Sequence, residues 1–104
     1  MKNFIVSEKK MQEKVRKFSI MLGEKYGVKK VYLFGSLAEG LFLKDSDIDL
    51  AVEGMDLESY LKALAEYRVV GGVHLDILHL GFCKPGIKKQ ILKNSNVKIL
   101  YEKE

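Results

Sequence analysis

The sequence predicts an α/β fold in which helices pack on a central β-sheet. Three observations predict it: an amphipathic helical stripe near the N-terminus, several short β-branched runs, and glycines or capping residues that separate these segments. The predicted order is helix, strand, brief helical turn, strand, helix, strand, helix, strand. A chain of 104 residues has room for a single domain, which we place at residues 1–104.

Three main helices are predicted from apolar spacing and from their ends. Between Ser7 and about Tyr26, apolar side chains recur at intervals of four, three and four residues, with Ser7 placed to cap the start and Gly27 to end the helix. Asp56 is placed to cap a second helix, and Pro85 suits the first turn of a third. The apolar residues of these helices are Met11, Val15, Phe18 and Leu22, then Leu57, Leu61, Leu64 and Ala65 on one side, then Ile87, Ile91 and Leu92.

Four short runs rich in β-branched or other apolar residues predict the strands. They are Val31 to Phe34, Asp47 to Val52, Val73 to Leu80 and Val97 to Tyr101. A bend at Gly35 and Ser36 ends the first run, and the residues that follow it can form at most a brief helical turn, over Leu37 to Gly40.

Composition excludes several classes of protein. With 47% hydrophobic residues the chain can bury a core, although a small one, so a homo-oligomer is compatible with it. The single cysteine, Cys83, excludes an internal disulfide framework and fits a reducing compartment. The N-terminal apolar stretch is too short for a signal peptide, and no run approaches the roughly 18 apolar residues of a membrane span. We therefore expect a soluble, cytoplasmic protein without a membrane partner.

Charge is distributed unevenly along the chain. Residues 1–30 carry nine Lys or Arg and three Glu, residues 31–83 carry three Lys or Arg and nine Asp or Glu, and residues 84–104 carry six Lys and two Glu. We interpret the basic ends as solvated helix surfaces, with attraction of a polyanion or an acidic partner as the alternative. The acidic centre requires a separate explanation, because its carboxylates are concentrated in a few places.

Two features of the central segment indicate chemistry, and the first is the bend at Gly35 and Ser36. A strand that ends in Gly-Ser and is followed by small residues lets the backbone approach a ligand closely. If a helical turn begins at Ser36, its free N–H groups favour an anion such as phosphate. Alone this pattern indicates an ordinary turn as readily as a phosphate site, and it matches neither the Walker nor the dinucleotide fingerprint.

The second feature is a pair of aspartates, Asp47 and Asp49, on one predicted strand. Residues two apart on a strand point the same way, about 6.6 Å apart along the chain. They could share one cation or two, and Mg²⁺ prefers such carboxylate oxygens. The alternative is a solvent-facing strand edge, but aspartate is a poor strand former and like charges on one face repel.

A third carboxylate, Asp76, lies within the most strand-like run, where apolar surroundings are expected. An ionised carboxylate there is costly unless it pairs with Lys or Arg or binds a metal. If this strand lies beside the strand of Asp47, three carboxylates meet next to the glycine-serine bend, which would suit phosphoryl transfer. His74 shares the strand face of Asp76 and could border the site, although we interpret it as a satisfied structural histidine.

The joined pattern resembles the signature of the DNA polymerase β-type nucleotidyltransferase superfamily. That pattern is Gly35-Ser36-Leu37-Ala38-Glu39-Gly40, five residues, then Ser46-Asp47-Ile48-Asp49-Leu50. Asp76 falls where that superfamily has its third aspartate, and the resemblance covers about Val31 to Leu80. Such a resemblance implies an α+β nucleotidyltransferase core, with a mixed sheet of about four strands and flanking helices.

The length resembles that of the minimal nucleotidyltransferases. Members of that branch act as antitoxins of HEPN-domain proteins encoded nearby, some by transferring AMP from ATP to a tyrosine of the partner. The resemblance implies that Gly35 and Ser36 contact the triphosphate and that Asp47 and Asp49 ligate two Mg²⁺ ions. It implies that Asp76 binds the catalytic ion and helps to deprotonate the attacking hydroxyl. ATP would be the substrate, and a HEPN-domain protein would be the partner.

One residue departs from the pattern of this branch, in which position 39 is commonly Arg. Here it is Glu39, and a carboxylate near a triphosphate would repel it unless Lys44 compensates. This departure favours an alternative, a non-catalytic module that neutralises its partner by binding alone. A nucleic-acid binder based on the basic N-terminal helix is a weaker alternative, because Phe18 and Tyr26 suit a packed face better than a stacking platform.

Overall fold

The computed structural model describes residues 8–43 and 45–104. Its elements follow the predicted order, with one additional short strand. The helices are α1 (Glu8–Tyr26), α2 (Gly35–Ala38), α3 (Leu57–Glu66) and α4 (Pro85–Lys93). The strands are β1 (Lys30–Phe34), β2 (Ile48–Glu53), β3 (Val69–Val70), β4 (Val73–His79) and β5 (Lys98–Glu102).

The strands form one mixed sheet in the order β3-β4-β2-β1-β5. β2 and β4 are parallel, whereas β1 is antiparallel to both β2 and β5, and β3 is antiparallel to β4. The predicted α/β fold with a mixed sheet and flanking helices is therefore confirmed. The additional strand, β3, has two residues, which is too short for any periodic pattern to reveal it in the sequence.

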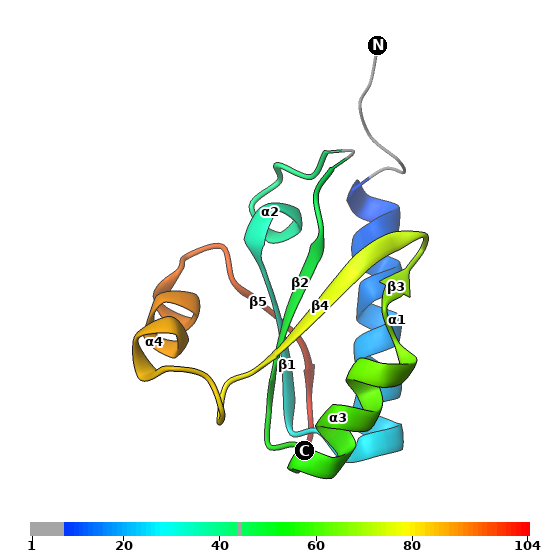
Figure 1. The fold of residues 1–104 in the computed structure, drawn as a ribbon. Helices are drawn as coiled ribbons and strands as arrows, with labels where there is room; N and C mark the ends of the chain where they lie inside the picture. The colour runs from blue at the N-terminus through cyan, green and yellow to red at the C-terminus, as the bar shows by residue number, and fades with distance from the viewer. Residues whose placement is uncertain (1–7, 44) are drawn as a thin grey trace.

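Helices cover the two faces of the sheet unequally (Figure 1). α1 and α3 lie on one face and α4 lies on the other. Alternation along β2 sends Ile48, Leu50 and Val52 into the core beneath α1, whereas Asp49 and Ala51 point to the side of α4. The core on the α1 side is the larger one, so the α4 side keeps an open stretch of sheet.

The stripe predicted on α1 is confirmed as its buried side. Met11, Val15 and Leu22 are fully buried. The helix ends at Gly27, as predicted, where φ is +69° and the N–H donates to the carbonyl of Gly23 at 2.9 Å. Ser7, the predicted cap, lies outside the described residues.

α3 is oriented differently from what its leucines suggest. Asp56 caps its start, as predicted. Leu57 and Leu61, however, are 52% and 54% exposed, so the predicted apolar side faces solvent. Ala63 is buried instead, and Tyr60 packs against the core while its hydroxyl donates to a backbone carbonyl of β4 at 2.7 Å. An aromatic ring with a polar tip can satisfy the sheet and the core together, which a leucine cannot.

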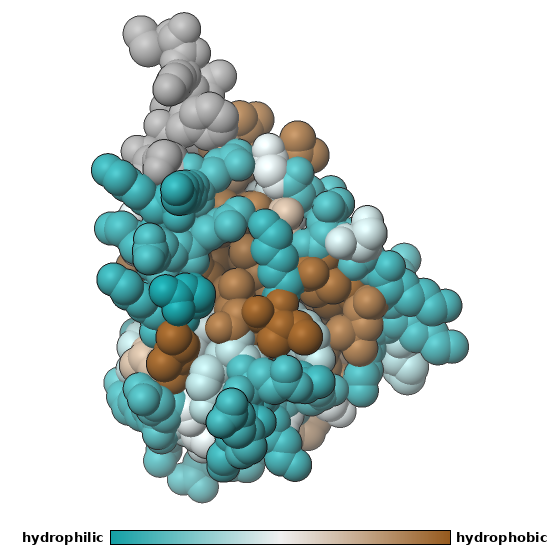
Figure 2. Space-filling view, turned by 180° about the vertical axis from the view of Figure 1, so that it is seen from behind, coloured by the Kyte–Doolittle hydropathy of each residue, from teal (hydrophilic) through white to brown (hydrophobic). Residues whose placement is uncertain are grey.

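The surface seen from behind is largely hydrophilic, with apolar areas near its middle (Figure 2). β5 is an edge strand of the sheet, and its Ile99 is 53% exposed. Within the described residues, no helix combines the length and the apolar character needed to cross a membrane.

Gly23 of α1 lies against the ring of Tyr101 in β5, and a Cβ at this position would overlap that ring. Although alanine is the better helix former, we expect Gly23→Ala to destabilise the protein by about 1–3 kcal/mol because the ring must move. Gly86→Ala in α4 is the matched control, since nothing lies within 4 Å of the added methyl. Its effect should be neutral or stabilising by up to about 1 kcal/mol. Equilibrium unfolding in urea measures both, and wild-type stability of Gly23→Ala would contradict this packing.

Candidate active site

The register of the sheet places the predicted aspartates side by side. In the parallel pair of β2 and β4, Asp49 and Asp76 are Cα partners. On the other side of β2, Asp49 is the Cα partner of Phe34, the last residue of β1. Asp47 lies two residues before Asp49, just ahead of β2. The aspartates therefore gather at one end of the sheet, beside the bend that follows β1.

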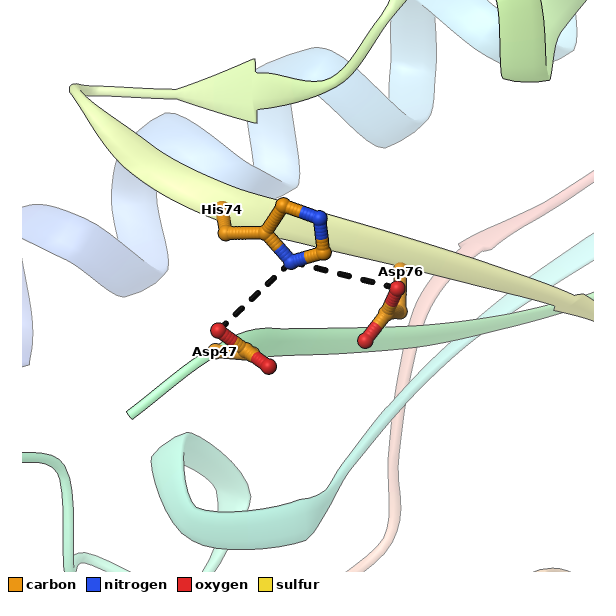
Figure 3. A group of neighbouring side chains, drawn as sticks. All are labelled: Asp47, His74 and Asp76. Carbon is orange, nitrogen blue, oxygen red and sulfur yellow. Dashed lines mark ion pairs between the residues drawn. The ribbon is translucent and has the colours of Figure 1, made fainter. Parts of the chain in front are cut away.

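His74 contacts two of these aspartates (Figure 3). Its Nδ1 lies 3.5 Å from Oδ1 of Asp47 and 3.9 Å from Oδ1 of Asp76. Each of the three side chains offers a ligand atom within 4.8 Å of the other two. The interpretation of His74 as a satisfied structural histidine is wrong, because its side chain is 58% exposed and faces carboxylates. The available signal was its spacing of two residues from Asp76, which puts both on one face of β4.

The apolar surroundings predicted for Asp76 are also absent. Its side chain is 58% exposed, because it lies on the face of β4 opposite to buried Leu75 and Ile77. Desolvation is therefore not the reason why Asp76 would need a partner. Repulsion is the reason: among the described residues, no Lys or Arg forms an ion pair with any of the three aspartates.

Asp49 experiences that repulsion most strongly. Burial, followed by the charges of Asp76 and Asp47, raises its pKa from 3.8 to about 6, with only His74 acting in the opposite direction. A cation among the three carboxylates would favour their ionised forms and lower this pKa. The electrostatics of the site therefore favour a positively charged ligand.

Gly35 lies directly against the carboxylate of Asp49. A Cβ at position 35 would overlap Asp49 Oδ2, and the φ of +77° belongs to the left-handed region that favours glycine. α2 begins at Gly35 without an intervening loop, two residues earlier than the predicted turn. The first N–H groups of a helical turn have no partner within it. The bend thus brings free backbone donors next to the aspartates.

Glu39 follows α2 as its C-cap and is exposed. Its backbone N–H donates to the carbonyl of Gly35 at 3.1 Å, so the residue lies one helical turn beyond the bend. Its side chain forms no ion pair with another described residue. Lys44, the residue proposed to offset its charge, lies outside the described residues.

The residues of this site fit a divalent cation. Asp47, Asp49 and Asp76 offer carboxylate oxygens, the ligands that Mg²⁺ prefers, and His74 adds an imidazole nitrogen. The side chains of Asp47 and Asp76 are 49% and 58% exposed, which leaves room for water and substrate oxygens to complete a coordination shell.

Comparison with known protein families identifies this arrangement. The family model described as nucleotidyltransferase domain matches residues 15–102, which include the bend and all three aspartates. The chain belongs to the nucleotidyltransferase domain family. Membership implies the use of a nucleoside triphosphate and a divalent metal, and the chain is accordingly a nucleotidyltransferase.

Individual relatives confirm the predicted resemblance to minimal nucleotidyltransferases. Protein adenylyltransferase MntA of Thermococcus cleftensis is 35% identical over 75 residues, which are 69% of this chain and 76% of the relative. A crystal structure of a toxin-antitoxin with AMP-PNP gives a TM-score of 0.61 at 22% identity, covering 89% of this chain and 74% of that chain. The complex of a tri-AMPylated Shewanella oneidensis HEPN toxin with an MNT antitoxin gives 0.58 at 20% identity, covering 93% and 74%. At these identities, the structural likeness shows a shared fold.

Asp49 should make the metal-free protein less stable as the pH rises. Its pKa of about 6 in the folded state exceeds its ordinary value of 3.8, so the folded protein binds the proton more tightly than the unfolded chain. Stability should then fall between about pH 4 and pH 6 and remain lower above that range. Asp49→Asn should be more stable than wild type at about pH 7.5, and this advantage should disappear near pH 4.

Urea unfolding without divalent metal measures this effect. Glu24→Gln is the control, because Glu24 is an exposed carboxylate on α1 with no described ion pair. An Asp49→Asn protein no more stable than wild type at about pH 7.5 would contradict the electrostatic account.

Gly35→Ala tests the close approach of the bend to Asp49. The substitution should displace the carboxylate and weaken Mg²⁺ binding at least about tenfold, on top of a conformational cost of about 1–2 kcal/mol. Gly72→Ala is the matched control, since φ is +80° and nothing lies within 4 Å of its added methyl. It should show the conformational cost alone. Metal titrations followed by calorimetry compare the variants, and equal affinities would argue against this role of Gly35.

Proposed function

We propose that this chain is a Mg²⁺-dependent protein adenylyltransferase that moves AMP from ATP onto a tyrosine hydroxyl of a HEPN-domain partner, and so acts as an antitoxin. The observation that carries the proposal is the convergence of Asp47, Asp49 and Asp76 beside Gly35. Related proteins support the choice of reaction: one is named a protein adenylyltransferase, and another is an MNT antitoxin complexed with an AMPylated HEPN toxin.

The bend would bind the triphosphate. Gly35 has no side chain, so the phosphates can approach the backbone closely, and the first N–H groups of α2 can donate to their oxygens. Ser36 adds a hydroxyl at the same place. These donors lie beside the carboxylates, so the α-phosphorus would be held close to them.

The three aspartates would divide the work of holding metal and acceptor. Asp47 and Asp49 would hold two Mg²⁺ ions together with triphosphate oxygens, and Asp76 would hold the ion nearer the acceptor. Bound there, Mg²⁺ supplies positive charge that stabilises the attacking and leaving oxygens. Asp76 is exposed enough to meet a hydroxyl arriving from solvent and to accept its proton. The acceptor oxygen then bonds to the α-phosphorus, and pyrophosphate leaves.

Loss of the carboxylates should abolish transfer. With ATP and Mg²⁺, we expect wild type to add AMP units to the co-purified HEPN-domain partner, and Asp47→Asn/Asp49→Asn to do so at less than about one-hundredth of that rate. Asp45→Asn is the matched control, because Asp45 belongs to the same segment but lies outside the group of possible ligands. Intact mass spectrometry of the partner measures the product. Undiminished transfer by the double variant would refute the assigned site.

A second function, neutralisation of the partner by binding alone, is favoured by the carboxylate of Glu39 near the bend. The adenylyltransferase proposal predicts that Asp47→Asn/Asp49→Asn/Asp76→Asn still binds the partner but no longer suppresses its toxicity in cells. Growth assays combined with co-purification separate the two functions. Full suppression by this triple variant would favour binding alone.

A further inference from the structure

A recess of about 300 Å³ lies on the α4 side of the sheet, next to the aspartates. Its apolar lining comes from Phe34 and Leu78 of the strands and from Ile87 and Ile91 of α4. Hydrogen-bonding side chains also line it, one following α2 and two on or just after α4: Glu39, Gln90 and Asn94.

The recess is continuous with the carboxylate site. Phe34 is the Cα partner of Asp49 across β1 and β2. Leu78 lies two residues after Asp76 on the same strand, and therefore on the same face. Gly35 lines the recess and also lies against Asp49. A ligand whose charged part binds at the aspartates can therefore reach this recess with another part.

The polar groups of the recess are available to a ligand. Asn94 Oδ1 accepts from the backbone N–H of Asn96 at 2.8 Å, which leaves its side-chain N–H groups free to donate. The amide of Gln90 and the carboxylate of Glu39 form no hydrogen bond with a described residue. The recess thus presents a carboxylate acceptor and amide donors beside an apolar lining.

We propose that this recess binds the base of the nucleoside triphosphate and selects adenine through Glu39. Adenine has flat apolar faces and an edge on which an exocyclic amino group stands next to a ring nitrogen acceptor. The amino group would donate to Glu39, and a ring nitrogen would accept from Asn94 or Gln90. This inference rests on the proposed function, because it places the triphosphate at the bend. It also gives Glu39 a role other than repelling phosphate.

A phenol acceptor fits the recess less well. It carries one hydroxyl, which would leave most of these three polar side chains without a partner. Uracil, hypoxanthine and guanine would each turn a carbonyl oxygen toward the carboxylate of Glu39. Such a pairing of two acceptors is unfavourable, and this is the physical basis of the expected selectivity.

The test compares ATP with ITP, which differs from ATP in carrying a carbonyl in place of the amino group. Binding of each to the full chain is measured by calorimetry with Mg²⁺, and tripolyphosphate serves as a probe without a base. Wild type should prefer ATP over ITP by about tenfold, and Glu39→Gln should remove that preference. Both nucleotides carry the same charge, so general repulsion by Glu39 cancels in their ratio.

Gln90→Ala should weaken ATP binding about fivefold and leave tripolyphosphate binding unchanged, since the side chain makes no described contact whose loss would unfold α4. Glu24→Gln and Asn96→Ala are the matched controls, each altering the same chemical group outside the recess. Neither should change the ratio of ATP to ITP affinity.

Three results would overturn the inference. One is a wild-type protein that binds ATP and ITP equally, and another is a preference for ATP that survives in Glu39→Gln. The third is unchanged nucleotide binding in Gln90→Ala with a raised KM for the protein acceptor, which would assign the recess to the acceptor. In these cases the proposed function stands. If wild type binds neither ATP nor tripolyphosphate, the proposed function fails as well, so the two failures are distinguishable.

Discussion

The parallel pairing of β2 with β4 is the constraint on which the site depends. It sets Asp49 beside Asp76, although two carboxylates on adjacent strands repel each other. The opposite face of the same strands holds that register: Leu50 and Ile77 are Cα partners, and both are buried. A slip of one residue would expose the apolar side chains and bury the acidic ones. Hydrophobic burial on one face thus holds together a charged group that would otherwise separate.

The second requirement is that nothing covers the acidic end of the sheet. On the α4 side, the buried cluster is small and consists of Tyr32, Ala51, Leu80 and Ile91. It ends before the row of Asp49 and Asp76, so α4 covers only the part of the face farther along the strands. The aspartates therefore stay accessible from solvent, while Gly35 brings the backbone up to them. An open site of this kind is compatible with an acceptor on a folded protein, which cannot enter a deep cavity.

Local sequence patterns predicted the elements wherever one residue decides the outcome. The glycine at position 27 ends α1, and Asp56 caps α3. Contacts between distant elements were beyond such patterns. The buried side of α3 depends on Tyr60 reaching a carbonyl of β4, and that partner becomes visible only when the sheet is assembled.

The candidate site was predictable to a similar degree. Spacing on one strand placed Asp47 and Asp49 on a common face, and the resemblance added Asp76. The importance of His74 was missed, because a lone histidine in a strand is usually structural and its carboxylate partner Asp47 comes from another segment. The desolvated carboxylate is Asp49 rather than Asp76, since the tertiary packing around the bend decides which one is buried.

The central claim is that the three aspartates form one cation-binding centre beside the bend. Anomalous diffraction from crystals grown with Mn²⁺ and a non-hydrolysable ATP analogue tests it most directly. The account predicts an anomalous peak within coordination distance of the carboxylates of Asp47, Asp49 and Asp76, with the phosphates extending toward Gly35. A bound nucleotide with no metal peak there, or a peak held by other residues, would contradict it.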